Sequence, residues 1–64
     1  MTARLYFSDR KWHLTWMPRR DFVRVEHFAA RDADDALALA QRFLPGATAI
    51  ETAPNGAMTL AVPE

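Results

Sequence analysis

The side chains in this sequence that could carry out chemistry are few. Ser8 is the only serine, Asp9 follows it directly, and His13 lies a few residues further along the chain. Together they offer a nucleophile, a base and a carboxylate, but no glycine-rich loop accompanies them to stabilise an oxyanion. We therefore expect no catalytic residues and no enzymatic activity.

Metal and cofactor chemistry has equally little support in the sequence. The chain has no cysteine, so thiolate ligands are absent. Its two histidines, His13 and His27, are expected on opposite faces of a sheet, where they could not share a metal. Gly46 and Gly56 both fit turns, which leaves no glycine for a phosphate-binding loop. We expect neither a metal nor a cofactor.

The same composition bears on location. A chain without cysteine suits a reducing compartment. No apolar run approaches the roughly 20 residues that span a bilayer, and residues 1–10 lack the apolar core of a signal peptide. We expect a cytoplasmic protein without a membrane partner.

Charge is divided sharply along the chain. Residues 1–31 hold seven basic and three acidic residues, a net charge of +4, whereas residues 32–64 hold one basic and five acidic residues, a net charge of −4. The overall charge of zero therefore conceals a dipolar molecule. Most of the aromatic residues also lie in the basic half, and this composition is typical of a binding surface.

Three segments of the basic half alternate apolar and polar residues, which predicts β-strands over residues 4–7, 12–17 and 22–27. A turn at Asp9–Arg10 would place Phe7 opposite Trp12 and Leu5 opposite Leu14. A second turn at Arg19–Arg20 is expected to give three further pairs: Trp16 with Val23, Leu14 with Val25, and Trp12 with His27. Both hairpins then place their apolar residues on one side, with Val23 and Val25 in the core.

A helix is predicted after these strands. Asp32 is a good N-cap, Asp34 and Asp35 suit the first helical turn, and Pro45–Gly46 ends the helix. Its apolar face is expected to comprise Ala33, Ala36, Leu37, Ala40, Phe43 and Leu44.

Residues 47–62 form a last predicted hairpin around Pro54–Asn55–Gly56. Its expected pairs are Ile50 with Leu60, Thr48 with Val62, and Thr52 with Met58. The chain is thus predicted to be one α+β domain over residues 1–64 with the order βββαββ, one helix packing on one face of a five-stranded antiparallel or mixed sheet. The order of the strands within the sheet is left open.

A single helix covers one face of such a sheet, so the opposite face, here called the open face, should be exposed. Tyr6 and Glu26 are both expected to face His13 there, and the basic turn of residues 18–21 adjoins it. An ordinary solvated sheet face is one interpretation. The other is a binding surface, because Tyr, Phe, Met and Arg are enriched at protein interfaces. The candidate partner-binding residues are Arg4, Tyr6, His13, Met17, Arg19, Arg20, Phe22 and Arg24.

Residues 32–64 pass from an Ala-rich helix through the Pro45–Gly46 stop to a strand ending Ile50-Glu51-Thr52, and then through an Asn55–Gly56 hairpin to a last strand over residues 58–62. This arrangement resembles that of some small phage-encoded anti-CRISPR proteins, inhibitors of type I CRISPR surveillance complexes, which are similar in length and in lacking cysteine. This chain differs in placing three strands before the helix. The resemblance implies inhibition by binding to a Cas protein and blocking its nucleic-acid path.

The sequence therefore favours a non-enzymatic protein-binding module, a phage or mobile-element inhibitor that occludes a surface of a larger bacterial protein complex. Two alternatives stay open. The same residues could bind single-stranded nucleic acid, with bases stacked on rings and arginines following the phosphates. The protein could also be a homodimeric structural or regulatory subunit whose open faces or edge strands pair.

Overall fold

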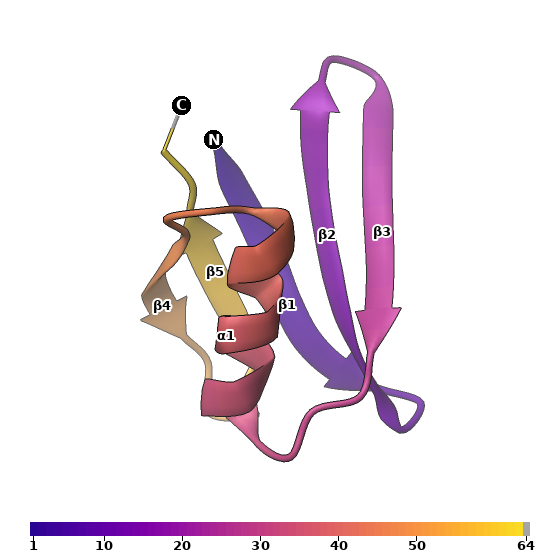
Figure 1. Ribbon diagram of the computed structural model, residues 1–64, viewed down its shortest axis with the longest axis vertical. Helices are drawn as coiled ribbons and strands as arrows, with labels where there is room; N and C mark the ends of the chain where they lie inside the picture. The colour runs from indigo at the N-terminus through magenta and orange to yellow at the C-terminus, as the bar shows by residue number, and fades with distance from the viewer. Residues whose placement is uncertain (64) are drawn as a thin grey trace.

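Five strands form one antiparallel sheet, and a single helix packs against one face of it (Figure 1). The computed structural model describes residues 1–63; Glu64, counted above in the acidic half, lies outside the described residues. The predicted α+β class and βββαββ order are confirmed. The elements are β1 (Thr2–Ser8), β2 (Lys11–Arg19), β3 (Phe22–Phe28), α1 (Ala33–Phe43), β4 (Thr48–Thr52) and β5 (Met58–Ala61).

The strand order, which the sequence left open, is β3-β2-β1-β5-β4. The last strand therefore lies beside the first, and β3 and β4 form the two edges. The start of β1 and the end of β5 lie side by side at one end of the sheet (Figure 1), where the Val62 N–H donates a 2.8 Å hydrogen bond to the Met1 carbonyl. No helix in residues 1–63 is long and apolar enough to cross a membrane.

The first hairpin has the predicted register, with Phe7 opposite Trp12 and Leu5 opposite Leu14. Its turn residues Asp9 and Arg10 both have positive φ, 54° and 65°. Positive φ at both central residues is the mark of a type I′ turn, whose twist matches that of the flanking strands. Because Arg10 carries a Cβ, this backbone conformation is strained there.

The second hairpin does not have the predicted register. Its turn is Arg20–Asp21, with Arg19 opposite Phe22, and the pairing shifts by one residue between Trp16 and Arg19. That interval contains Pro18, which has no N–H and cannot take a regular place in the ladder. A bulge absorbs the extra residue and reverses which side chains face the helix.

The bulge exchanges the two faces of β3. Phe28 rather than His27 lies opposite Trp12, and Glu26 rather than Val25 lies opposite Leu14. The strand forms as predicted, but the predicted face of every β3 side chain is wrong: the even-numbered residues lie on the helix side and the odd-numbered residues on the open face. Val23 and Val25, expected in the core, are 60% and 45% exposed.

The core lies between the sheet and α1. Leu5, Leu14 and Leu60 are fully buried, and Ala36 and Ala40 are fully buried beneath them on the helix. The small alanine side chains let α1 approach the sheet closely, as the sequence predicts. Further residues of the predicted apolar face are buried or partly buried, but Phe43 is 44% exposed and stacks on Phe28 with ring centroids 6.1 Å apart.

Side chains secure the start of α1 as expected. The Asp32 carboxylate accepts a 2.8 Å hydrogen bond from the Asp35 N–H, which confirms the N-cap. The Asp35 carboxylate in turn accepts a 3.0 Å hydrogen bond from the Arg31 N–H. That backbone hydrogen bond lowers the pKa of Asp35; desolvation opposes the shift, and the nearby Arg31 guanidinium adds to the lowering.

The register of the last hairpin, formed by β4 and β5, is partly as predicted. Thr52 lies opposite Met58, but Ala49 rather than Ile50 lies opposite Leu60, and Thr48 lies opposite Ala61 rather than Val62. Ile50 falls in a register shift between Ala49 and Glu51 and is 60% exposed. A bulge again places an apolar residue outside the core.

Candidate interaction surface

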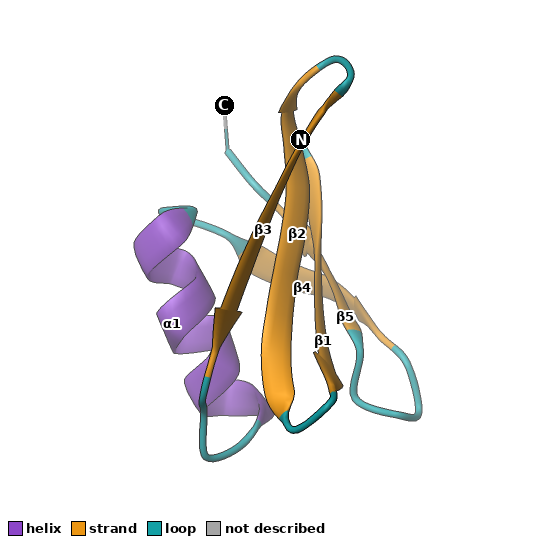
Figure 2. Cartoon of the chain, turned by 90° about the vertical axis from the view of Figure 1, so that its right-hand side faces the viewer, coloured by secondary structure: helices purple, strands orange, loops and turns teal. Residues whose placement is uncertain are grey.

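The helix covers only part of one sheet face. In the side view of Figure 2, α1 runs along one side of the sheet and no element lies along the other. Beyond the helix, the end of β2, the turn and the start of β3 project freely, and residues 15–25 are here called the distal hairpin (Figure 1). Both of its faces carry large exposed side chains.

On the open face, the distal hairpin carries an apolar cluster. Val23 and Met17 are 60% and 50% exposed, and Val25 lies beside them. Met17 and Val23 also border an open depression of about 450 Å³ that Met1, Arg4 and Thr15 help to line. Because no element within residues 1–63 covers these side chains, the apolar cluster is available to a partner.

On the helix side, the distal hairpin pairs arginines with rings. The Arg24 guanidinium lies 5.8 Å from the centre of the Trp16 ring, and that of Arg19 lies 5.6 Å from the Phe22 ring. Arg24 Nη2 also lies 3.5 Å from Glu26 Oε1, in an exposed ion pair. These cation–π contacts hold the guanidinium groups in place at a modest gain in energy.

A row of rings crosses the open face near the first turn. Tyr6 stacks on His13 with centroids 5.1 Å apart, and His13 meets His27 edge-on at 4.6 Å. Tyr6 faces His13 as predicted, but Glu26 does not, because the register shift places His27 there instead. His13 Nε2–H donates to the Ser8 carbonyl at 2.8 Å, so the contact between these two residues uses the backbone of Ser8.

The contact between His13 and His27 overturns the expectation that they lie on opposite faces. Two imidazole side chains alone are too few ligands to hold a metal ion in a protein. Within residues 1–63 no group of three or more His, Cys, Asp or Glu side chains is placed to hold a metal ion.

The eight predicted partner-binding residues do not form one surface. Their common feature is proximity to the uncovered part of the sheet, but the bulge divides them. Arg4, Tyr6, His13 and Met17 lie on the open face; Arg19, Phe22 and Arg24 lie on the helix side; Arg20 lies in the turn.

The assignment of Phe22 and Arg24 to the open face is therefore wrong, and the sequence reasoning missed Val23, Val25 and His27. The signal that could have found them is Pro18, read as the start of a turn. It lies inside β2, where a proline indicates a bulge.

Comparison with known protein families, with curated proteins and with solved structures finds no match to this chain.

Proposed function

We propose that this protein is a binding module whose distal hairpin docks on a larger protein. The observation that carries this proposal is the apolar cluster of Met17, Val23 and Val25 on a sheet face that the other described residues leave uncovered. A 64-residue chain has few apolar side chains to spare from its core. Leaving two valines and a methionine exposed together favours a role outside folding.

The charge around the cluster favours a partner surface that is both apolar and acidic. Arg4 lines the adjoining depression, and Arg19 and Arg20 stand at the end of the hairpin. Arginine suits such a contact because its planar head offers several donors to carboxylates. Basic residues at the rim would steer an acidic partner, and the apolar cluster would hold it.

The narrower function implied by the resemblance belongs to the same proposal. A cytoplasmic inhibitor that occludes a bacterial protein complex, a Cas protein among the candidates, would use such a surface without catalysis. Occlusion requires only that the bound hairpin fill a site another molecule needs.

Affinity capture from a bacterial lysate tests the docking proposal with a matched pair of variants. Val23→Thr and Ile50→Thr each replace an equally exposed β-branched residue, both 60% exposed, on opposite edges of the sheet. Threonine keeps the strand propensity and removes apolar surface. We expect Val23→Thr to weaken capture of a specific protein about tenfold and Ile50→Thr to leave it unchanged.

Equal capture by both variants would contradict docking through the distal hairpin. Recovery of nucleic acid alone would instead support the single-stranded nucleic-acid alternative. Affinity for an oligonucleotide would then fall steeply as salt is raised, because each phosphate contact releases counterions.

A further inference from the structure

The edge strand β3 is unusually suited to pairing with another strand. It runs for seven residues, Phe22–Phe28, and within the described residues β2 is its only neighbour in the sheet. The bulge of this hairpin falls in β2, between Trp16 and Arg19, so β3 itself is regular. Half of its backbone N–H and C=O groups point away from β2 and are free to extend the ladder.

The other edge is different. β4 is five residues long and contains a register shift at Ile50. Short edge strands and bulges discourage strand addition, whereas a long regular edge invites it. Of the two edge strands, β3 is therefore the one suited to pairing with a strand of another molecule.

The sequence of β3, Phe-Val-Arg-Val-Glu-His-Phe, is complementary to itself about Val25. We propose that two copies of this protein pair antiparallel along β3, with a twofold axis through Val25. In this register the numbers of two residues that lie opposite one another add to 50, so that Val25 lies opposite Val25 of the second copy. The two five-stranded sheets would join into one continuous sheet.

Charge supports this register. Arg24 of one copy lies opposite Glu26 of the second copy, and the twofold axis repeats the pair. Within one copy these side chains already share a face and lie 3.5 Å apart, with 51% and 31% of their side-chain surface exposed. Two such copies would form an alternating array of four charges, in which each guanidinium has a carboxylate both along and across the strands.

The apolar residues agree with the same register. On the helix side, Phe22 would lie opposite Phe28 of the second copy, and Phe22 is 46% exposed in the single chain. On the open face, Val25 would meet Val25 of the second copy. Aromatic and β-branched cross-strand pairs are among the most stabilising in sheets.

The division of charge along the chain also agrees with this antiparallel pairing of two copies. With Phe22 opposite Phe28, the turn after Arg19 of one copy approaches the point where the second copy leaves β3 for α1. The first turn of α1 carries Asp34 and Asp35, next to the N-cap Asp32. The basic end of each copy is thus brought toward the acidic end of the other.

Charge reversal tests the pairing, with dissociation constants measured by sedimentation equilibrium of the whole chain without any partner. Arg24→Glu and Glu26→Arg each place like charges opposite one another twice, and we expect each to weaken the dimer at least about tenfold. An equimolar mixture of the two variants restores opposite charges at every position. We expect that mixture to form a heterodimer at least as tight as the wild-type dimer. Arg42→Glu, a charge reversal on exposed helix surface, should leave the wild-type affinity unchanged.

A single cysteine gives an independent test, because the chain has none of its own. Val25→Cys would place the two thiols directly opposite on the twofold axis, within disulfide range. Val23→Cys is the matched control, because its counterpart lies roughly 13 Å further along the strand. We expect mild oxidation to link Val25→Cys into dimers and to leave Val23→Cys largely unlinked.

A wild-type chain that stays monomeric up to about 1 mM would overturn the proposal. So would a dimer that both charge reversals leave intact, or equal cross-linking of the two cysteine variants. These results concern the chain alone, so they are separate from those of the capture experiment.

Discussion

The part of the sheet beneath α1 and the distal hairpin use the same kinds of residue for opposite purposes. Beneath α1, leucines of β1, β2 and β5 and alanines of the helix are fully buried, and little apolar surface is left. In the distal hairpin, Met17, Val23 and Val25 are about half exposed. One region buries its apolar side chains in the core, whereas the other leaves apolar side chains half exposed to solvent.

Substitutions of one apolar side chain in each region should separate the two regions most strongly. Leu60→Ala opens a cavity in the packed core and should destabilise the protein by about 2–5 kcal/mol. Val23→Thr on the distal hairpin should change the free energy of unfolding by less than about 0.5 kcal/mol. Urea denaturation of both variants measures the difference. A loss above about 2 kcal/mol for Val23→Thr would mean that the hairpin is part of the cooperative core.

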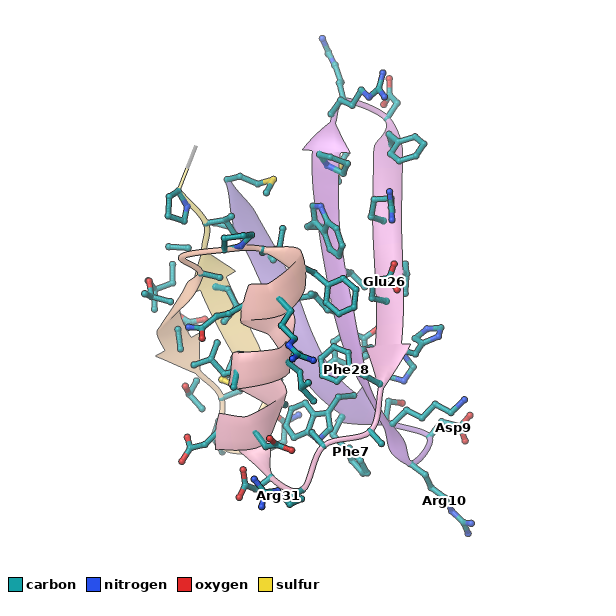
Figure 3. All side chains as sticks on the ribbon, in the orientation of Figure 1. Phe7, Asp9, Arg10, Glu26, Phe28 and Arg31 are labelled. Carbon is teal, nitrogen blue, oxygen red and sulfur yellow. The ribbon has the colours of Figure 1, made fainter. Side chains whose placement is uncertain are left out.

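The turn at Asp9–Arg10, which connects β1 beneath the helix to β2 of the hairpin, offers the next largest effect. Figure 3 shows Arg10 projecting from this turn away from the sheet, and its φ is 65°. Arg10→Gly removes a strained Cβ and gives the Asp-Gly pair that type I′ turns favour, so we expect a gain of about 1 kcal/mol. Thermal denaturation is the measurement.

Arg20→Gly serves as the control for that gain. It removes the same charge from a turn, but at a residue without positive φ. We expect no stabilisation from it. Equal stabilisation by both variants would show that charge, rather than backbone strain, accounts for the effect.

The stacked pair of Phe28 and Phe43 connects the end of β3, beyond the distal hairpin, to α1. Phe28 extends from the end of β3 toward α1 (Figure 3), where its ring packs nearly parallel to that of Phe43 at 13°. A double-mutant cycle with Phe28→Leu and Phe43→Leu should give a coupling energy of about 0.5–1.5 kcal/mol. Additive effects in urea denaturation would mean that β3 is anchored to the helix by burial of Phe28 alone.

The smallest expected effect is a pH dependence of stability that arises at the start of α1, the helix that covers the core. Because hydrogen bonding to the Arg31 N–H lowers the pKa of Asp35, the folded state holds the carboxylate more readily than the unfolded state does. Its contribution is complete above the unfolded pKa of about 3.9 and is lost as pH falls through the lower folded pKa. Denaturation between pH 6 and about pH 2.5 should show a loss of stability that Asp35→Asn reduces. An identical pH dependence in that variant would contradict this account.

The accuracy of sequence reasoning also differs between the two regions. The N-cap Asp32, the pairing of Leu5 with Leu14 and the fully buried Ala36 and Ala40 were all predicted, because periodicity and local hydrogen bonding determine them. The register of β3 was wrong, because a single extra residue at a bulge reverses the face of every side chain beyond it. Val23 and Val25 do alternate with polar residues along β3, but the bulge places their side chains on the open face.

Two features depend on contacts that a pattern of residues cannot determine. The choice of β5 rather than β4 as the neighbour of β1 is made by long-range packing. The split of the candidate site follows from the bulge, so Arg24 and Met17 share a hairpin but lie on opposite faces. Pro18 was the one residue whose chemistry pointed to this outcome.

We propose that the distal hairpin, and not the opposite edge of the sheet, contacts a partner. The most direct measurement is the dissociation constant of a captured partner for the Val23→Thr and Ile50→Thr variants. We predict about tenfold weaker binding for Val23→Thr and wild-type binding for Ile50→Thr. Wild-type binding by Val23→Thr, or an equal loss in both variants, would contradict the claim.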